Sequence, residues 1–330
     1  MKLLWASERL LVNDMSANSN NQGRAYEYVI INRLCEYIKQ YRPVHILQNK
    51  SFEDAKDAYD EISQGLRDLF PLSADAAIAK LYDLEPLIFE DNDELELMIQ
   101  NDGKGEDGDV RDILIIRSSV GWEIGLSVKH NHLAVKHSRL SNTIDFGDKW
   151  YNKKCSDTYW SEINSVFDKL DSYIAQNMEW NQITEKSDKI YLPILSAWMK
   201  ELQKAYNEDH KICKRFVEYL LGRSDFYKVI SLDKRRITKL QGYNLHGQLN
   251  KAGKRRPTTA VPLVRLPDAI YHIGFKRNSK TTIEIVMNNG WSFSFRIHNA
   301  DRKVNKSLKF DIQFIGVPVV LSLDCPWDDV

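Results

Sequence analysis

The stretch that decides the fold is Asp109–Lys129, DVRDILIIRSSVGWEIGLSVK. Two runs rich in isoleucine, valine and leucine flank Ser118-Ser119-Val120-Gly121, and this pattern predicts two strands joined in a hairpin. Side chains alternate between the two faces of a strand, so the second run has an apolar face and a polar face. The apolar set is Trp122, Ile124, Leu126 and Val128, and the polar set is Glu123, Gly125, Ser127 and Lys129. We expect the first set to pack in a core and the second to carry chemistry.

Acidic side chains occur on both strands of this hairpin. Asp109 and Asp112 lie just before or within the first apolar run, on opposite faces, so the hairpin places an aspartate near Glu123 and Lys129. Mg²⁺ prefers a few carboxylate oxygens plus waters, and a bound divalent cation lowers the pKa of a water that attacks a phosphodiester. The hairpin is therefore a candidate centre for Mg²⁺-dependent phosphodiester hydrolysis.

Charge is distributed unevenly along the chain. The 330 residues carry 46 basic and 46 acidic side chains, so the net charge is zero. Residues 1–110 hold 11 basic and 22 acidic residues, whereas residues 231–309 hold 17 basic and 4 acidic residues. A concentrated positive stretch is typical of proteins that bind phosphate backbones, and it predicts a partner of that kind.

The composition is that of a globular protein, with 43% hydrophobic residues and enough length for a substantial core. Its longest apolar runs fall far short of the ~20 residues that a membrane span needs. Charged residues also interrupt the N-terminal stretch before a signal-peptide cleavage site could follow. We therefore expect no membrane partner and a cytoplasmic location. The four cysteines are scattered, without a metal-binding or disulfide pattern, and we expect reduced, buried thiols.

Helices and strands alternate in the N-terminal two thirds of the chain. Helical spacing of apolar residues predicts a helix over about residues 22–40, after a polar leader, and a short strand follows at 44–48. An acidic helix is expected over Phe52–Leu69, ended by Pro71. Further on, we expect a helix over residues 156–176, a helix that begins at Pro193 and runs to about Leu221, and a strand at 226–232.

The C-terminal third changes to a basic, β-rich pattern. Alternating strands are expected at residues 269–275, 281–287 and 291–297, the last two joined by Asn288-Asn289-Gly290. Trp291, Phe293 and Phe295 alternate within one strand and are expected in the core. The whole pattern predicts an α/β fold in which helices flank a mixed sheet and a basic β-rich region is appended.

The hairpin resembles the PD-(D/E)XK nuclease superfamily, in which an aspartate opens one strand and an acid-x-lysine follows on the next. Asp112 matches the family aspartate because it immediately precedes ILII, and Lys129 matches the lysine. The sequence departs from the pattern at Ser127, which occupies the usual acid position. The missing carboxylate must then come from elsewhere. The candidates, in order, are Glu123, Glu27 on the first helix and Asp145.

Three segments sharpen the resemblance: NNQGRAYEY at Asn20–Tyr28, GDVRDIL at Gly108–Leu114 and SVKHNHLAVKHSRLS at Ser127–Ser141. Together they resemble the HaeIII family of type II restriction endonucleases over most of the chain. The resemblance implies a restriction-endonuclease-like fold, cleavage of duplex DNA at GGCC to 5′-phosphate ends, and a cognate DNA methyltransferase for self-protection. A palindromic target also suits a homodimer on DNA.

The resemblance and the chemistry together give the expected organisation and site. The expected domains are a flexible leader at 1–20, a nuclease core at 21–230 and a basic DNA-binding region at 231–330. Lys129 would stabilise developing negative charge or position the attacking water. The catalytic candidates are Asp112, Glu123, Lys129 and Glu27, and the Mg²⁺-ligand candidates are Asp112, Glu123 and Asp109. Two alternatives stay open: Glu123 forms an ion pair with Arg111 or Arg117 across the hairpin, and Glu27 is an ordinary exposed helix residue.

Candidates for DNA contact lie in the segment after the second strand and in the basic C-terminal third. The first group would touch phosphates or guanine edges and comprises His130, Asn131, His132, Lys136, His137 and Arg139. The second group would bind the backbone and comprises Arg235, Arg236, Lys254, Arg255 and Arg256. The alternative for both groups is a solvated polar surface.

Two rival functions are consistent with the same residues. A non-catalytic DNA-binding regulator would keep the hairpin only as scaffold, and its binding would be indifferent to Mg²⁺. A repair nuclease of the same superfamily would cut according to DNA structure, so its products would share no end sequence.

Overall fold

The computed structural model describes residues 2–101, 109–132, 135–136 and 138–327. The chain forms two compact units. Unit 1 consists of Met1–Leu133, Ser224–Val264 and Val320–Val330, and unit 2 consists of Ala134–Arg223 and Arg265–Val319. Each unit therefore combines segments that are far apart in the sequence.

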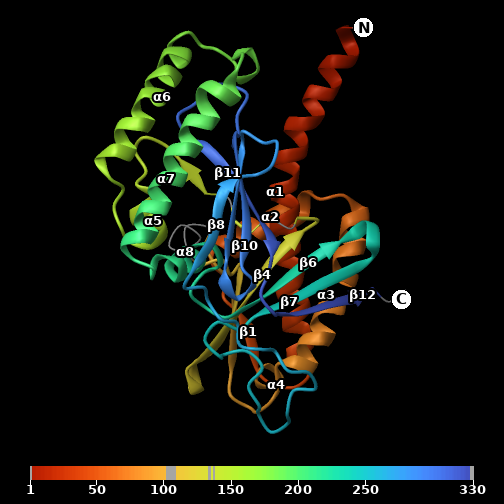
Figure 1. The fold of residues 1–330 in the computed structure, drawn as a ribbon. Coiled ribbons are helices and arrows are strands. Elements are labelled where there is room, and N and C mark those ends of the chain that lie inside the picture. The colour runs from red at the N-terminus through yellow and green to blue at the C-terminus, as the bar shows by residue number, and fades with distance from the viewer. Residues whose placement is uncertain (1, 102–108, 133–134, 137, 328–330) are drawn as a thin grey trace. The chain divides into compact units, whose positions relative to one another are not determined.

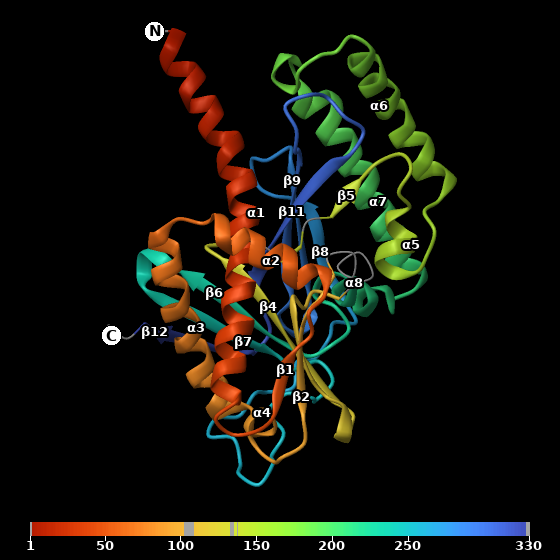
Figure 2. The same cartoon turned by 180° about the vertical axis from the view of Figure 1, so that it is seen from behind.

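Unit 1 is a seven-stranded mixed sheet in the order β1-β2-β3-β4-β6-β7-β12. The β1–β2 and β4–β6 pairs are parallel, and the other neighbouring pairs are antiparallel. The strands are β1 (Val44–Ile46), β2 (Leu95–Ile99), β3 (Ile113–Arg117), β4 (Trp122–His130), β6 (Phe226–Leu232), β7 (Ile237–Tyr243) and β12 (Leu321–Pro326). The helices are α1 (Lys2–Ile38), α2 (Lys50–Glu61), α3 (Gln64–Leu84) and α4 (Pro86–Phe89). The first three cover one face of the sheet, lying behind its strands in Figure 1 and in front of them in Figure 2.

The helix α1 extends the predicted first helix toward the N-terminus. It spans Lys2–Ile38, so it includes the polar segment for which the sequence predicted a flexible leader. Within the predicted part, Tyr26, Ile30 and Leu34 are buried at helical spacing. This buried stripe packs α1 against β2 and β4.

The prediction that Pro71 ends a helix is wrong. Helix α2 ends earlier, at Glu61, and Pro71 lies inside the next helix, α3. A proline in a helix interior removes one backbone hydrogen bond and disfavours the helix. The helix continues because Phe70, Ala74, Ile78 and Leu81 bury one of its faces against the unit, and this burial outweighs the local preference.

The predicted hairpin is confirmed as β3 and β4. Ile113 pairs with Leu126, and Arg117 pairs with Trp122, in antiparallel register. The connection makes one 3-10 turn and ends at Gly121, whose φ of 60° favours glycine. The apolar set of β4 is buried, so Glu123, Gly125, Ser127 and Lys129 share the opposite face.

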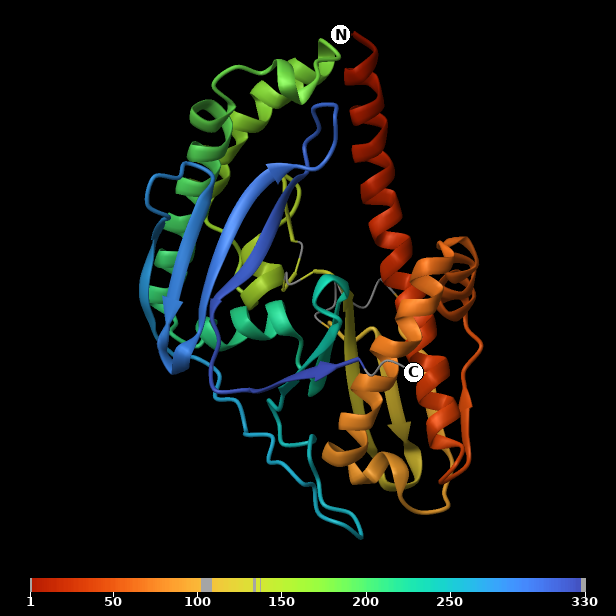
Figure 3. The ribbon, with the colours of Figure 1, turned by 90° about the vertical axis from the view of Figure 1, so that its right-hand side faces the viewer.

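Unit 2 pairs helices with an antiparallel sheet in the order β5-β11-β10-β9-β8. The strands are β5 (Arg139–Leu140), β8 (Ile270–Phe275), β9 (Thr282–Met287), β10 (Ser292–Asn299) and β11 (Leu308–Gly316). The helices are α5 (Phe146–Tyr151), α6 (Asp157–Ala175), α7 (Leu192–Glu208) and α8 (Ile212–Leu221). They cover one face of this sheet, as the green helices and blue strands of Figure 3 show. On that face Trp291, Phe293 and Phe295 are fully buried, which confirms their predicted place in the core.

The predicted helix from Pro193 to about Leu221 is two helices. Pro193 lies in the first turn of α7 as expected, but the chain leaves the helical conformation at Asp209. The Asp209 side chain accepts a hydrogen bond from the backbone N–H of Lys211 at 3.0 Å. Such local side-chain bonds compete with helix continuation, and α8 begins afresh at Ile212.

The structure shows the state of the four cysteines and the apolar character of the helices. All four cysteines are buried free thiols, as expected. Among the helices within the described ranges, none has both the length and the apolar character that a membrane span requires.

Candidate active site

Asp112, which immediately precedes β3, meets Lys129 of β4. The Lys129 Nζ donates to Asp112 Oδ2 at 2.9 Å, and the Val128 backbone N–H donates to the same oxygen at 2.6 Å. Ser127 Oγ lies 3.4 Å from this oxygen. The Lys129 and Asp112 side chains are 31% and 24% exposed. A carboxylate and an ammonium group are thus held together where solvent, and therefore a substrate, can reach them.

The backbone holds Asp112 in place from both sides. Its N–H donates to the Leu126 carbonyl at 2.8 Å, and its own carbonyl accepts from the Gln100 N–H at 2.9 Å. The side-chain donors all end on Oδ2, so Oδ1 is the oxygen that none of the described residues engages. This geometry leaves one carboxylate oxygen available to a cation.

Asp109 and Glu123 are both held by Arg111, whose side chain is only 7% exposed. Arg111 donates to Asp109 Oδ2 at 2.7 Å through Nη2 and to Glu123 Oε1 at 2.6 Å through Nη1. Burial raises the pKa of Asp109, but the hydrogen bonds and charge of Arg111 lower it by more, so it ends below its ordinary value. The alternative of a Glu123–Arg111 ion pair across the hairpin is therefore the one found in this structure.

Gly125 makes room for the Arg111 side chain on the polar face of β4. A Cβ atom at this position would lie 2.3 Å from Arg111 Cδ, well inside van der Waals contact. Glycine inside a strand often marks such a close approach. The small residue between Glu123 and Ser127 is therefore needed for the buried arginine.

Glu27 on α1 lines a cavity of about 90 Å³ beside the start of β3. Gln100 lines the same cavity, and it is bonded through its backbone to Asp112 and through its side-chain amide to the Arg111 carbonyl at 2.7 Å. Asp54 of α2 contributes a second carboxylate to the lining. Gln100 thus connects the cavity that contains Glu27 with the strand that begins after Asp112.

Lys228 on β6 is a second lysine at this site, and sequence analysis missed it. It is paired with Ser127 of β4 in parallel register and is 6% exposed. Burial lowers its pKa to about 8, the charge of Lys129 lowers it as well, and the charge of Asp112 raises it. The available signal was a lysine in the middle of the apolar run FYKVISL. Its neighbours could not be inferred, because β4 and β6 are almost a hundred residues apart.

The last residue of β4, His130, and the next residue, Asn131, are both bonded to Asp233. His130 Nε2 lies 2.6 Å from Asp233 Oδ2, and the Asn131 side chain donates to the same oxygen at 3.0 Å. The Asp233 N–H donates back to Asn131 Oδ1 at 3.1 Å. The His130 side chain is 6% exposed and packs edge-on against Phe70. These contacts favour a role for His130 in holding the end of β4 over direct contact with DNA.

The other candidates of this segment are distributed over both units. His132 is exposed in unit 1, whereas His137 lies outside the described residues. In unit 2, Lys136 Nζ donates to the Tyr219 carbonyl at 2.8 Å and lies 3.8 Å from the centre of its ring. Arg139 is exposed on β5. Among the described members of this group, Asn131, His132 and Arg139 are exposed and therefore accessible to a DNA partner.

The basic block at residues 254–256 is tied to acidic residues of its own unit. Lys254 Nζ lies 2.9 Å from Asp91 Oδ1, and Arg255 Nε lies 3.3 Å from Glu90 Oε1. Arg256 is exposed. Two of the three positive charges are therefore already paired within unit 1, which the linear charge pattern did not predict.

Three further candidates have local partners. Arg235 forms an exposed ion pair with Asp324 at 3.5 Å, and the guanidinium of Arg236 lies 5.9 Å from the centre of the Trp327 ring. Asp145 caps α5 by accepting from the Asp148 N–H at 3.0 Å, and it lies in unit 2. Its contacts favour a structural role for this carboxylate.

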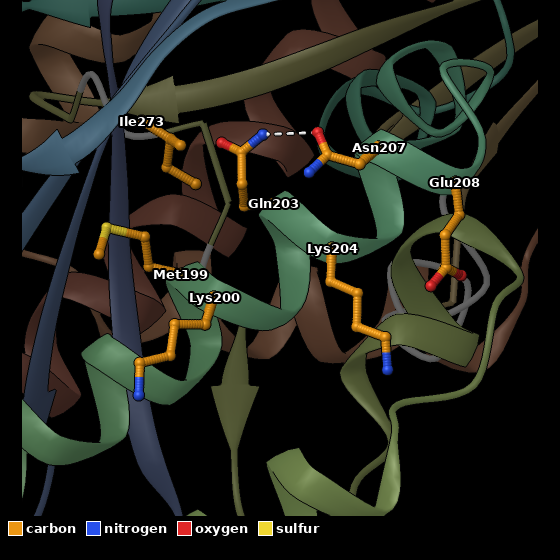
Figure 4. Close-up of a pocket in the computed structure, with 7 residues that line it drawn as sticks. All are labelled: Met199, Lys200, Gln203, Lys204, Asn207, Glu208 and Ile273. Carbon is orange, nitrogen blue, oxygen red and sulfur yellow. Dashed lines mark hydrogen bonds between the residues drawn. The ribbon is translucent and has the colours of Figure 1, made fainter.

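A larger hollow of about 470 Å³ lies in unit 2 between α7 and β8. One face of α7 from Met199 to Glu208 lines it, together with Ile273 (Figure 4). Figure 4 shows Gln203 and Asn207 joined by a hydrogen bond, which is 3.1 Å long. The side chains of Lys200 and Lys204 point away from this hydrogen bond. None of the site residues predicted from the sequence lines this hollow.

The oxygen donors of unit 1 fit a magnesium ion. Within the described ranges, no three or more His, Cys, Asp or Glu side chains converge as a ready metal cage. Mg²⁺ does not need one, because it binds through one or two carboxylates and keeps several waters. Asp112 Oδ1 is a hard oxygen donor of this kind, and Glu27 offers a second carboxylate in the cavity that Gln100, the backbone partner of Asp112, also lines.

A family model described as HaeIII restriction endonuclease matches residues 23–318. The chain belongs to this family. It is also 45% identical, over 318 residues, to the type II restriction enzyme HaeIII of Haemophilus aegyptius, and the match covers 96% of this chain and 100% of that enzyme. No solved structure matches the chain. These findings confirm the resemblance carried by the three sequence segments, and they identify the protein as a site-specific deoxyribonuclease.

Proposed function

We propose that the protein is a Mg²⁺-dependent type II restriction endonuclease that cleaves duplex DNA at GGCC and leaves 5′-phosphate ends. The observation that carries the proposal is the Lys129–Asp112 pair, 2.9 Å apart in the β3–β4 hairpin region, in a member of a restriction-endonuclease family. The GGCC target rests on the family resemblance. Guanine offers O6 and N7 as acceptors in the major groove, which suits recognition by basic side chains.

In the proposed mechanism Asp112 and Glu27 hold the cation, and Lys129 acts on the scissile phosphate. Bound Mg²⁺ would neutralise charge on the phosphate and lower the pKa of the attacking water. Lys129, held by Asp112 but partly exposed, donates to a non-bridging phosphate oxygen and stabilises the negative charge that develops there. A 5′-phosphate product requires that the P–O3′ bond breaks and that O3′ takes up a proton.

Lys228 and Arg111 complete the charge distribution around this pair. Because Lys228 is paired with Ser127, the site has one positive charge more than the superfamily pattern implies. Lys228 therefore acts as a positioning residue whose field favours the negatively charged transition state. Asp109 and Glu123 stay candidate ligands, and either would have to give up Arg111 to bind a cation.

The proposal also implies partners. A palindromic site read by a two-fold protein calls for a homodimer on DNA. An enzyme that cuts GGCC in the cytoplasm requires a cognate methyltransferase to protect the host's own sites. Both partners follow from the proposed target.

The test is cleavage of plasmid DNA in Mg²⁺, followed by sequencing of the ends. Wild-type protein is expected to give discrete fragments whose ends all map to GGCC sites in the plasmid. Lys129→Ala and Asp112→Asn should each lower the cleavage rate by about 100-fold or more while binding persists. The control Lys56→Ala removes an exposed lysine on α2 and should cut like the wild type.

Each rival function predicts a different result in this assay. Retained cleavage in both active-site variants contradicts the assigned roles. DNA binding with no cleavage in Mg²⁺ supports a regulator, and fragments without a common end sequence support a structure-specific nuclease.

A further inference from the structure

A row of basic side chains crosses three neighbouring strands of unit 2. Arg139 of β5 is paired with Lys309 of β11, and Lys309 is paired with His298 of β10. Arg296, two residues before His298 on β10, is paired with Asp311 of β11. The alternation of side chains places all of these on one face of the sheet. The intervening residues, such as Ile297 and Phe310, are buried on the other face.

This row is electrostatically unfavourable in the protein alone. Like charges directly opposite each other on neighbouring strands destabilise a sheet. The pKa of Lys309 is lowered, first by burial and then by the charge of Arg139. The pKa of His298 is likewise lowered, by burial and then by Arg296 and Lys309. Holding these groups close together therefore costs the folded protein free energy.

The carboxylates of this face do not balance the row. Asp311 forms an ion pair with Arg296 at 3.3 Å, and no residue in the described ranges forms an ion pair with Arg139 or Lys309. The described contacts of Arg139 are to the carbonyl and hydroxyl of Ser307. The row therefore keeps a net positive charge that a bound anion would neutralise.

Two of the three basic residues in the β10–β11 loop form ion pairs with acids, and the third, Lys303, donates to Asn177 Oδ1. Arg302 lies 2.6 Å from Glu179, and Lys306 lies 2.7 Å from Asp171. Both are paired with acids of the same unit, although they are only a few residues from the row in sequence. The contrast indicates that the row is not simply part of a generally basic surface.

The dimensions of the row suit a polynucleotide backbone. Neighbouring strands lie about 4.8 Å apart, so the span from β5 to β10 is about 10 Å. One strand of duplex DNA places a phosphate at every ~3.4 Å of its axis, and neighbouring phosphates lie farther apart than this rise because the strand also turns, so the row faces about two phosphates. The blue strands of Figure 3 show β9, β10 and β11 side by side in this sheet.

We propose that Arg139, Lys309, His298 and Arg296 form a phosphate-contact site for the backbone of duplex DNA, independent of base sequence. The inference rests on the proposed function, because it takes the substrate of that function as the ligand. Sequence analysis had selected only Arg139 of these four. The other three are separated from it by more than 150 residues, and only the sheet brings them together.

The test is the salt dependence of DNA binding, measured by fluorescence anisotropy in EDTA so that no cleavage occurs. Two duplexes of equal length and composition are used, one with GGCC and one with the site scrambled. Binding constants fall with salt with a log–log slope of about −0.9 for each phosphate contact. The double variant Arg139→Gln/Lys309→Gln should therefore have a slope shallower by about 1.8, and its Kd at 0.1 M salt should rise about 60-fold on both duplexes.

The matched control is Arg302→Gln/Lys306→Gln, which removes the same two charges from the paired positions and should leave the slope unchanged. The Arg139/Lys309 variant should keep or raise the Tm, since it relieves like-charge repulsion. An unchanged slope, a loss confined to the GGCC duplex, or a lower Tm would each overturn the inference. Wild-type cleavage at GGCC is scored separately, so failure of the proposed function is distinguishable from failure of this site.

Discussion

Replacing Lys228 with methionine is expected to stabilise the protein while lowering its cleavage rate. Lys228 is buried on β6, and its pKa is about 8 where the ordinary lysine value is 10.5. At ~1.4 kcal/mol per pH unit, this difference corresponds to about 3 kcal/mol. Keeping the ammonium group charged in the folded protein therefore costs about that much, with the attraction of Asp112 already included.

The free-energy cost of the buried Lys228 charge depends on pH. Below about pH 8 the Lys228 side chain is charged in both the folded and the unfolded protein, so the full cost applies. As the pH rises through 8 toward 10.5, the folded side chain becomes neutral first and the cost disappears. Methionine has a similar length and no charge. Lys228→Met should thus raise the free energy of unfolding by about 3 kcal/mol at pH 7 and by little above pH 10.5.

The assay is urea unfolding of wild type and variant at pH 7 and at pH 10, together with plasmid cleavage at pH 7. Lys56→Met is the control, because that lysine is exposed and should show no such gain. A variant that is less stable at pH 7, or equally stabilised at both pH values, would refute the argument from burial. Unchanged cleavage would refute the role of Lys228 in supporting the transition state.

The remaining predictions concern a buried acid and a crowded glycine. Burial raises the pKa of Glu85 to about 7 from 4.5, so its contribution to stability is full below about pH 4.5 and is lost as the pH rises through 7. Between pH 4.5 and 8.5 the free energy of unfolding of the wild type should fall by about 3 kcal/mol more than that of Glu85→Gln. Urea unfolding across this pH range measures both, and an equal change with pH in the two proteins would contradict the prediction. Gly125→Ala should cost about 1–3 kcal/mol and reduce cleavage, because its Cβ would lie 2.3 Å from Arg111 Cδ. Gly65→Ala, where a Cβ has open space, is the control in the same urea assay, and equal stabilities of the two variants would count against the crowding argument.

Elements built from neighbouring residues could be predicted from the sequence. The hairpin of β3 and β4, the strand pair of β9 and β10, and the helix α6 follow from periodic patterns within single short segments. The Pro71 prediction was wrong because the burial of distant surfaces against α3 outweighed a local preference. Local patterns therefore predict elements well where no distant contact overrides them.

The same division applies to the site. The family, the places of Asp112 and Lys129 in the hairpin, and the departure at Ser127 could all be predicted from the sequence, because one short segment contains the three residues. Only the tertiary structure placed Lys228 beside Ser127, since parallel pairing of β4 and β6 has no local signature. It also decided which charges are neutralised within the protein. Ion pairing depends on distance in space, so neither the partners of the 254–256 block nor the row from Arg139 to His298 could be read from the order of residues.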